Sequence, residues 1–180
     1  MNFKDKVVLV TGATGGIGKA IAIAFAKKGA KVIVNARKLS KDKDGSTVLD
    51  EIEKAGGEAV FVKGDVADSN SVQNIIRDGI EAFGRIDILV NNAGIVIPGT
   101  LESTSEEEFD LTMDVNVKGT FLMSKYVVPH MKKQGGGVIV NIGSVAALKG
   151  HVDRAAYCAS KGAVVALSRA MAADHVKDNI

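Results

Sequence analysis

The sequence predicts an α/β fold: a doubly wound parallel sheet with helices on both of its faces. Short β-branched runs alternate with longer helix-like segments along the whole 180 residues. The strand-like runs are apolar at nearly every position, which is typical of parallel strands buried on both faces. Right-handed crossovers between such strands favour the doubly wound arrangement.

The first half of the chain is predicted to hold most of the strands. The run KVVLVT (6–11) is β-branched and indicates a first strand, and the periodic segment after it predicts a helix that ends at Gly29. The same patterns predict strands at 31–36, 58–65 and 85–94, with helices near 46–55 and over 71–84.

The second half is predicted to be mainly helical. Residues 105–133 read as one long helix that bends or ends near Pro129, because proline lacks an amide hydrogen. A strand is expected at 135–144 and a last helix over 155–174. The chain stops soon after that helix, before a further strand. We therefore expect one domain over 1–180 that is incomplete at its carboxyl end.

Composition excludes several classes of function. A net charge of +2, with basic and acidic residues interspersed, does not indicate a nucleic-acid or anionic-membrane partner. A single cysteine, Cys158, cannot form an internal disulfide, and no group of residues has metal-ligand spacing. The sequence shows neither a signal-peptide pattern nor an apolar run long enough to span a bilayer. These observations predict a cytoplasmic protein without a metal site.

The segment TGATGGIG (11–18) lies between the first strand and the first helix. Glycines here allow a sharp turn, a close approach of the backbone to a pyrophosphate, and tight packing of the helix on the sheet. The helix start adds free N–H groups and a favourable dipole. The turn therefore predicts a dinucleotide site, with a plain tight turn as the alternative. The residues expected at the phosphates are Gly12, Thr14, Gly15, Gly16, Ile17 and Gly18.

The end of the second strand bears on the choice between NAD and NADP. A carboxylate there would bind the ribose 2′-hydroxyl, whereas an arginine would pair with a 2′-phosphate. The chain has Arg37 and Lys38 at this point and no acid. This favours NADP over NAD, although solvated surface charges would look the same.

Tyr157 and Lys161 are four residues apart on the last helix, so they share one face. A phenol ordinarily has a pKa near 10, and a nearby ammonium would favour the phenolate and make it a usable acid and base. The alternative is a core-edge tyrosine beside a snorkelling lysine. Ser144, at the end of the fifth strand, could bind a carbonyl oxygen or serve as a cap. Asn116 could hold a water or the lysine, or point outward to solvent.

These motifs resemble the short-chain dehydrogenase/reductase family, in its single-domain branch. The matching stretches occur in the family's order along the chain: TGATGGIG (11–18), GDV (64–66), NNAG (91–94), Asn116 in MDVNVKG, GS (143–144) and YCASK (157–161). The resemblance implies a Rossmann-like dinucleotide-binding domain and a nucleotide-dependent oxidoreductase. It also implies a homodimer or homotetramer.

The resemblance also implies a role for each matching residue. Tyr157 would be the proton donor and acceptor, and Lys161 would favour its phenolate and bind the nicotinamide ribose. Ser144 would orient the carbonyl, and Asn116 would support a water-linked proton relay through Lys161. At the cofactor, Arg37 is joined by Asp65 and Val66, which would lie beside the adenine. The wall of the cofactor site would be formed by Asn92, Ala93 and Gly94. The alternative for NNAG is a plain strand-ending turn.

The leading interpretation is an oxidoreductase that transfers a hydride between NADP(H) or NAD(H) and a small secondary alcohol or ketone, with Tyr157 as the acid and base. Two other hypotheses stay open. The first is a dinucleotide-binding sensor or scaffold subunit without turnover. The second keeps the fold but catalyses dehydration or epimerisation.

Overall fold

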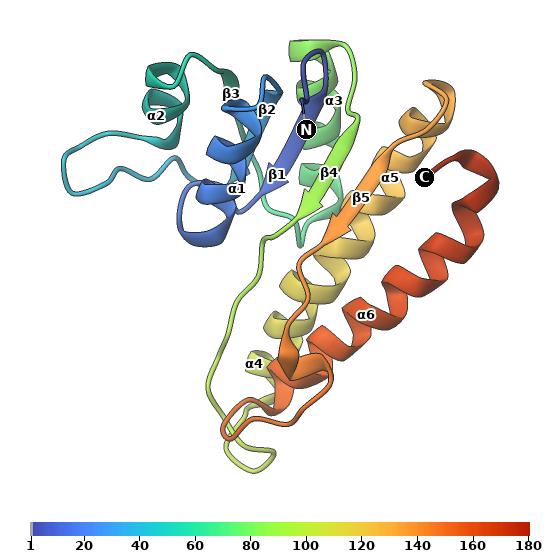
Figure 1. Ribbon diagram of the computed structural model, residues 1–180. Helices are drawn as coiled ribbons and strands as arrows, with labels where there is room; N and C mark the ends of the chain where they lie inside the picture. The colour runs from blue at the N-terminus through green and yellow to red at the C-terminus, as the bar shows by residue number, and fades with distance from the viewer. Residues whose placement is uncertain (1) are drawn as a thin grey trace.

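A parallel sheet forms the centre of the computed structural model, which describes residues 2–180 (Figure 1). Within these residues the sheet has five strands in the order β3-β2-β1-β4-β5, so the chain builds outward from β1 in both directions. This confirms the predicted doubly wound sheet. The strands are β1 (Val7–Thr11), β2 (Lys31–Ala36), β3 (Glu58–Lys63), β4 (Ile88–Asn91) and β5 (Val138–Asn141).

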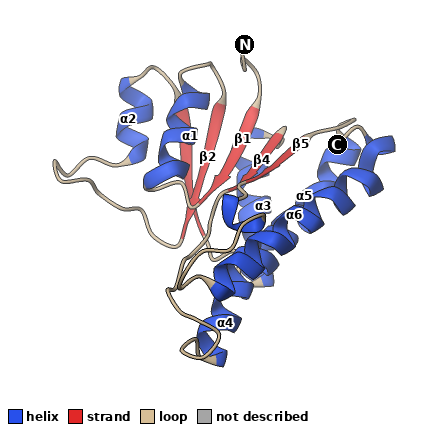
Figure 2. Ribbon diagram, turned by 60° about the horizontal axis from the view of Figure 1, so that its bottom comes forward, coloured by secondary structure: helices blue, strands red, loops and turns tan. Residues whose placement is uncertain are grey.

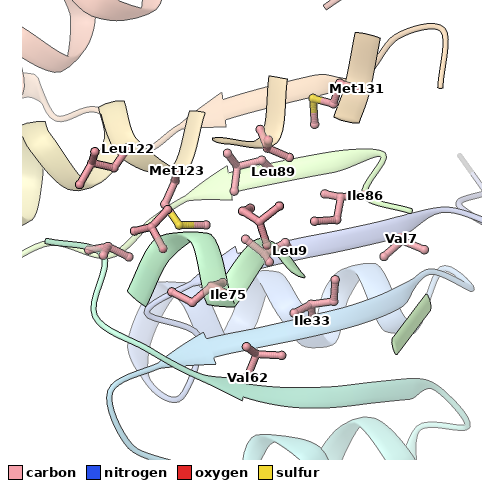
Figure 3. Packing of buried hydrophobic residues seen from close by; sticks show 14 residues of the cluster. Val7, Leu9, Ile33, Val62, Ile75, Ile86, Leu89, Leu122, Met123 and Met131 are labelled. Atoms are coloured by element: carbon pink, nitrogen blue, oxygen red, sulfur yellow. The ribbon is translucent and has the colours of Figure 1, made fainter. Parts of the chain in front are cut away.

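Helices cover both faces of the sheet, as predicted (Figure 2). Helices α1 (Gly16–Ala26) and α2 (Val48–Lys54) pack on one face, and α3 (Ser69–Phe83) and α5 (Gly119–Lys133) pack on the other. On the second face Leu9 and Leu89 of the sheet lie among Ile75 of α3 and Met123 of α5 (Figure 3). Helix α6 (Ala155–His175) runs beside α5 in both views (Figures 1 and 2).

The cover of the sheet is uneven. Every residue of β1 is buried, whereas Val138 and Val140 of β5 are 52% and 40% exposed. Their register partners Ile88 and Val90 belong to the core on the α1 side. That face of the sheet is therefore well covered over the central strands and open over the edge strand β5.

The long helix predicted at 105–133 is present, and it contains a π-helical turn that was not predicted. It consists of α4 (Glu106–Met113), one π-helical turn (Asp114–Lys118) and α5. Pro129 itself does not end the helix, because α5 continues through it to Lys133, where the predicted segment also ends. Met131, which follows Pro129 by two residues in the last turn of α5, is fully buried. Its burial stabilises this last turn and outweighs the lost backbone hydrogen bond.

The strands β4 and β5 end earlier than predicted, at Asn91 and Asn141. Residues 92–94 and 142–144 are therefore loops at the carboxyl edge of the sheet. This is the edge at which open α/β sheets bind their ligands.

Candidate active site

The glycine turn between β1 and α1 depends on the absence of side chains. Gly12 and Gly16 have φ angles of +63° and +53°, in the left-handed region. A Cβ on Gly18 would lie 2.4 Å from both the Asn92 Nδ2 and the Gly12 carbonyl oxygen. A Cβ on Gly15 would meet no atom of residues 2–180 within 4 Å. The turn is thus tight toward the sheet and open toward the ligand side.

The start of α1 is suited to an anion. Gly15 is its N-cap, no side chain of the described residues caps this end, and its first turn holds no acid. The N–H groups of a first helical turn have no partner within the helix. They and the helix dipole together favour a phosphate group at this position.

Asn92 locks the glycine turn to β4. Its Nδ2 donates to the carbonyl oxygens of Thr11 (2.9 Å) and Gly12 (3.2 Å). The Thr11 hydroxyl oxygen in turn accepts from the backbone N–H groups of Asn92 and Ala93, both at 3.0 Å. The NNAG stretch is therefore a strand-ending turn that also holds the glycine turn in place.

A cleft of about 610 Å³ opens at the carboxyl edge, next to this turn. Its volume lies within the range of small-molecule sites. The predicted cofactor residues that line it are Gly12, Thr14, Arg37, Asp65, Val66, Ala93 and Gly94. The other predicted cofactor-binding residues do not line it, namely Gly15, Gly16, Ile17, Gly18, Asn92, Tyr157 and Lys161. Gly12 and Gly18 let the turn pack against Asn92 without a clash, and Gly15 and Gly16 leave its outer side open, so the residues present fit the pyrophosphate of a dinucleotide.

Two features of the cleft were missed from the sequence. Asn35, in β2, is buried and donates from Nδ2 to the Val62 carbonyl oxygen at 3.0 Å, which joins β2 to β3 under the cleft. A polar residue within an apolar strand was the available signal. Besides Lys38 and Gly64, which belong to predicted segments, the cleft is lined by Ala36, Ser40, Ile95, Leu111 and Val115. Ser40 and Leu111 gave no signal, since only the folded chain brings them to the cleft.

Tyr157 and Lys161 lie on one face of α6. The Lys161 Nζ is 5.8 Å from the centre of the Tyr157 ring and donates to the Ile142 carbonyl oxygen at 2.7 Å. Lys161 is only 6% exposed, so it is not a snorkelling lysine. Burial lowers the pKa of Lys161, because desolvation disfavours the ammonium. A lysine has three N–H donors, so two remain for a ligand or a water.

Asn116 lies in the π-helical turn and is buried, not directed to solvent. Its Oδ1 accepts from the Ile95 N–H at 2.8 Å, and its Nδ2 donates to the Ile95 carbonyl oxygen and the Ser160 hydroxyl, both at 3.0 Å. Ser160 donates to the Tyr157 carbonyl oxygen at 2.8 Å. Since Ile95 lines the cleft, Asn116 links the cleft to the helix that carries Tyr157.

Ser144 lies three residues beyond the end of β5, in the loop that leads to α6. It is the N-cap of the short 3-10 helix Val145–Ala147, and its hydroxyl oxygen accepts from the Ala146 N–H at 3.1 Å. The Ser144 hydroxyl hydrogen is not used in that bond. Ser144 is therefore a cap whose O–H can still be donated to a ligand.

Two negative findings concern residues 2–180. No helix among them is long and apolar enough to cross a membrane. No three His, Cys, Asp or Glu side chains of this part of the chain come together as a metal site would require.

Comparison with known proteins identifies relatives for nearly the whole chain. The family model described as short chain dehydrogenase matches residues 6–180. An uncharacterised oxidoreductase of Thermotoga maritima is 55% identical over 176 residues, which cover 98% of this chain and 68% of that protein. The peroxisomal multifunctional enzyme type 2 of Drosophila melanogaster is 39% identical over 100% of this chain but only 31% of its own length.

A solved structure gives the same fold. A 7α-hydroxysteroid dehydrogenase in complex with NADH and 7-oxo glycochenodeoxycholic acid superposes with a TM-score of 0.92 at 36% identity. The match covers 99% of this chain and 69% of that one. The chain therefore spans about a third to two thirds of the length of these relatives.

Proposed function

Because the chain belongs to the short-chain dehydrogenase family, we propose that it is an NAD(P)-dependent oxidoreductase that interconverts a secondary alcohol and a ketone. The observation that carries this proposal is the buried connection from the nucleotide-sized cleft to Tyr157. It runs from Ile95 through Asn116 and Ser160 to the backbone of Tyr157. A nucleotide-sized cleft that is joined by buried hydrogen bonds to the helix carrying the phenol suits hydride transfer coupled to proton transfer.

Each residue of the chain has a defined task in this proposal. When bound, the nicotinamide supplies or accepts the hydride. In the reducing direction, Tyr157 donates its phenolic proton to the carbonyl oxygen of the substrate, and Ser144 donates a hydrogen bond to the same oxygen. In the oxidising direction, the Tyr157 phenolate removes the proton from the alcohol. Both side chains come from the carboxyl edge at which the cleft opens.

Lys161 and Asn116 support Tyr157. The Lys161 ammonium lies close enough to the Tyr157 ring to stabilise the phenolate. The side-chain amide of Asn116 is fully engaged with Ile95 and Ser160, so it acts on the site through the position of α6. A relay water, if held near Asn116, would bind to its backbone and not to its amide.

The test is turnover over a panel of secondary alcohols and ketones that includes hydroxysteroids and acyl thioesters. We expect the complete protein to consume reduced nicotinamide with at least one ketone. Tight dinucleotide binding without turnover over the whole panel would favour the sensor or scaffold hypothesis. A product of changed mass without cofactor oxidation would favour dehydration, and one of unchanged mass would favour epimerisation.

We also propose that NADP(H) is preferred over NAD(H). Arg37 and Lys38 follow β2 directly and line the cleft, together with Ser40. Their positive charges suit a 2′-phosphate, and no acid stands at that strand end. Arg37→Ala should weaken NADPH binding about ten- to hundredfold and spare NADH, because a charge-assisted bond to a phosphate contributes roughly 1.5–3 kcal/mol. Equal weakening of both would contradict the preference.

For the assembly we propose a cytoplasmic homodimer or homotetramer that acts on small molecules. Phe109 of α4 and Phe121 of α5 are 42% and 46% exposed, and α6 is rich in small residues. Exposed aromatic side chains on neighbouring helices are typical of subunit interfaces. Light scattering of the complete protein measures the mass, and a monomer at micromolar concentration would contradict this part of the proposal.

A further inference from the structure

Lys19 forms an ion-pair cluster behind the cleft. It lies in the first turn of α1, and its Nζ contacts the carboxylates of Asp42 and Glu51, both at 2.5 Å. The Lys19 side chain is only 16% exposed, less than most paired surface lysines. The hydrogen bonds that Lys19 donates to Asp42 and then to Glu51 raise the pKa of Lys19, so it remains an ammonium throughout the physiological range.

The two carboxylates come from different elements. Glu51 is on α2, whereas Asp42 is in the loop 37–47 that joins β2 to α2. Asp42 begins a turn within this loop, which its N–H closes by donating to the Ser46 carbonyl oxygen at 2.8 Å. Lys19 therefore ties that turn to the helix that follows the phosphate-binding glycines.

The same loop carries the positive side of the cleft. Arg37, Lys38 and Ser40 line the cleft, and Ser40 lies two residues before Asp42. Leu39 packs on the core at the α1 side, so the loop is held at Leu39 and again at Asp42. The ion-pair cluster around Lys19 therefore anchors the loop 37–47 just beyond the residues that line the cleft.

We propose that Lys19 is a positioning residue for cofactor specificity, which holds the loop of Arg37, Lys38 and Ser40 against a 2′-phosphate through Asp42. This inference rests on the proposed NADP preference. NADPH and NADH differ only at the 2′-phosphate, so a displaced loop weakens NADPH and leaves NADH binding nearly unchanged. The pyrophosphate contacts lie at the glycine turn, which Lys19 does not anchor.

The experiment is a titration of NADPH and NADH against the complete protein, with binding followed by calorimetry so that no substrate is needed. Lys19→Met should weaken NADPH about three- to fivefold, the size expected of one partly exposed ion pair. NADH affinity should change less than twofold. Lys19→Arg keeps the positive charge and should bind NADPH as tightly as the wild type does. Lys27→Met removes the same charge at the other end of α1, where no ion pair is found within residues 2–180, and should leave both affinities unchanged.

A double-mutant cycle shows whether Lys19 acts through Asp42. In an Asp42→Asn background the tie is already broken, so Lys19→Met should cause no further loss of NADPH affinity. A full additional loss would mean that Lys19 contacts the phosphate itself and would overturn the inference. So would equal weakening of NADPH and NADH. If the wild type binds both dinucleotides equally, the NADP preference itself fails. If it prefers NADPH but Lys19→Met keeps that preference, only the role of Lys19 fails.

Discussion

The glycine turn and the Tyr157 region, which we propose to be the two ends of one site, are built differently. The turn lies at the centre of the sheet, where β1 is fully buried and Asn92 bonds directly to the backbone of the turn. Tyr157 lies on α6 at the sheet edge, beside a strand whose outer valines are about half exposed. The turn combines glycine backbone angles with bonds from Asn92, whereas the Tyr157 end is held by side-chain hydrogen bonds.

This difference has a consequence for function. The cofactor end needs small residues at defined backbone angles, so its position follows from the core. The Tyr157 end depends on two polar contacts, namely Asn116 with Ser160 and Lys161 with the Ile142 carbonyl oxygen. Binding of the dinucleotide should therefore be separable from proton transfer by single substitutions.

The largest expected effect belongs to the Tyr157 end alone. Tyr157→Phe removes the proton donor and should lower kcat by about 10²–10⁴-fold, the usual contribution of a positioned acid or base. The dissociation constant of NADPH should stay within twofold of the wild type. Steady-state kinetics and a binding titration check the two halves of this prediction. Turnover at the wild-type rate would refute the role of Tyr157.

Asn116 tests the link between the two ends. Asn116→Ala leaves the Ile95 N–H, the Ile95 carbonyl oxygen and the Ser160 hydroxyl without their buried partner. We expect a loss of about 2–4 kcal/mol in the free energy of unfolding, because each unsatisfied buried group costs about 1–3 kcal/mol. Denaturant titration measures it. The control Asn74→Ala removes an exposed amide of α3 and should cost less than about 0.5 kcal/mol.

Gly18 tests the cofactor end alone. A Cβ at Gly18 would clash with Asn92 and Gly12, so Gly18→Ala should cost about 1–3 kcal/mol of unfolding free energy and weaken dinucleotide binding. Gly15→Ala is the matched control, since its Cβ enters open space and its φ of −163° suits any residue. Equal thermal shifts for the two variants would mean that the turn does not depend on close packing.

The smallest effect concerns the burial of Lys161. Burial lowers the pKa of Lys161 below the ordinary 10.5, so the unfolded chain holds this proton more tightly than the folded one. The ammonium therefore destabilises the fold at neutral pH, and this cost is relieved as pH rises through the lowered pKa toward 10.5.

Substitution of Lys161 isolates that cost. The stability of Lys161→Met relative to the wild type should be highest near neutral pH and should decrease as pH rises. Thermal unfolding over that range measures the trend, with the exposed Lys133→Met as the control. A difference that grows with pH would contradict the burial of the ammonium.

The same contrast explains what the sequence could predict. The alternating pattern and the glycine turn depend on local spacing, and strand β2 has the predicted bounds, residues 31–36. Local propensity alone does not show how far the helix runs past Pro129, because it does not include the burial of Met131. The π-helical turn could not be predicted, since it accompanies a contact between Asn116 and Ile95 across 21 residues of sequence.

The candidate site divides in the same way. The residues of the turn and of the β2 end were found from motif spacing, and the structure places Gly12, Thr14 and Arg37 around one cleft. Asn92 was expected only as a wall of that cleft. Its bonds to Thr11 and Gly12 join segments 80 and 81 residues apart, and no local pattern encodes such a pair.

The most direct test of the proposed oxidoreductase is a label transfer. The complete protein is supplied with a ketone that it reduces and with a reduced cofactor that carries deuterium at the transferable position of nicotinamide C4. If the protein transfers a hydride from nicotinamide C4, the product alcohol gains one deuterium on the former carbonyl carbon, detected by mass spectrometry. A product that forms without deuterium, or a cofactor that is never oxidised, would contradict the proposed hydride transfer.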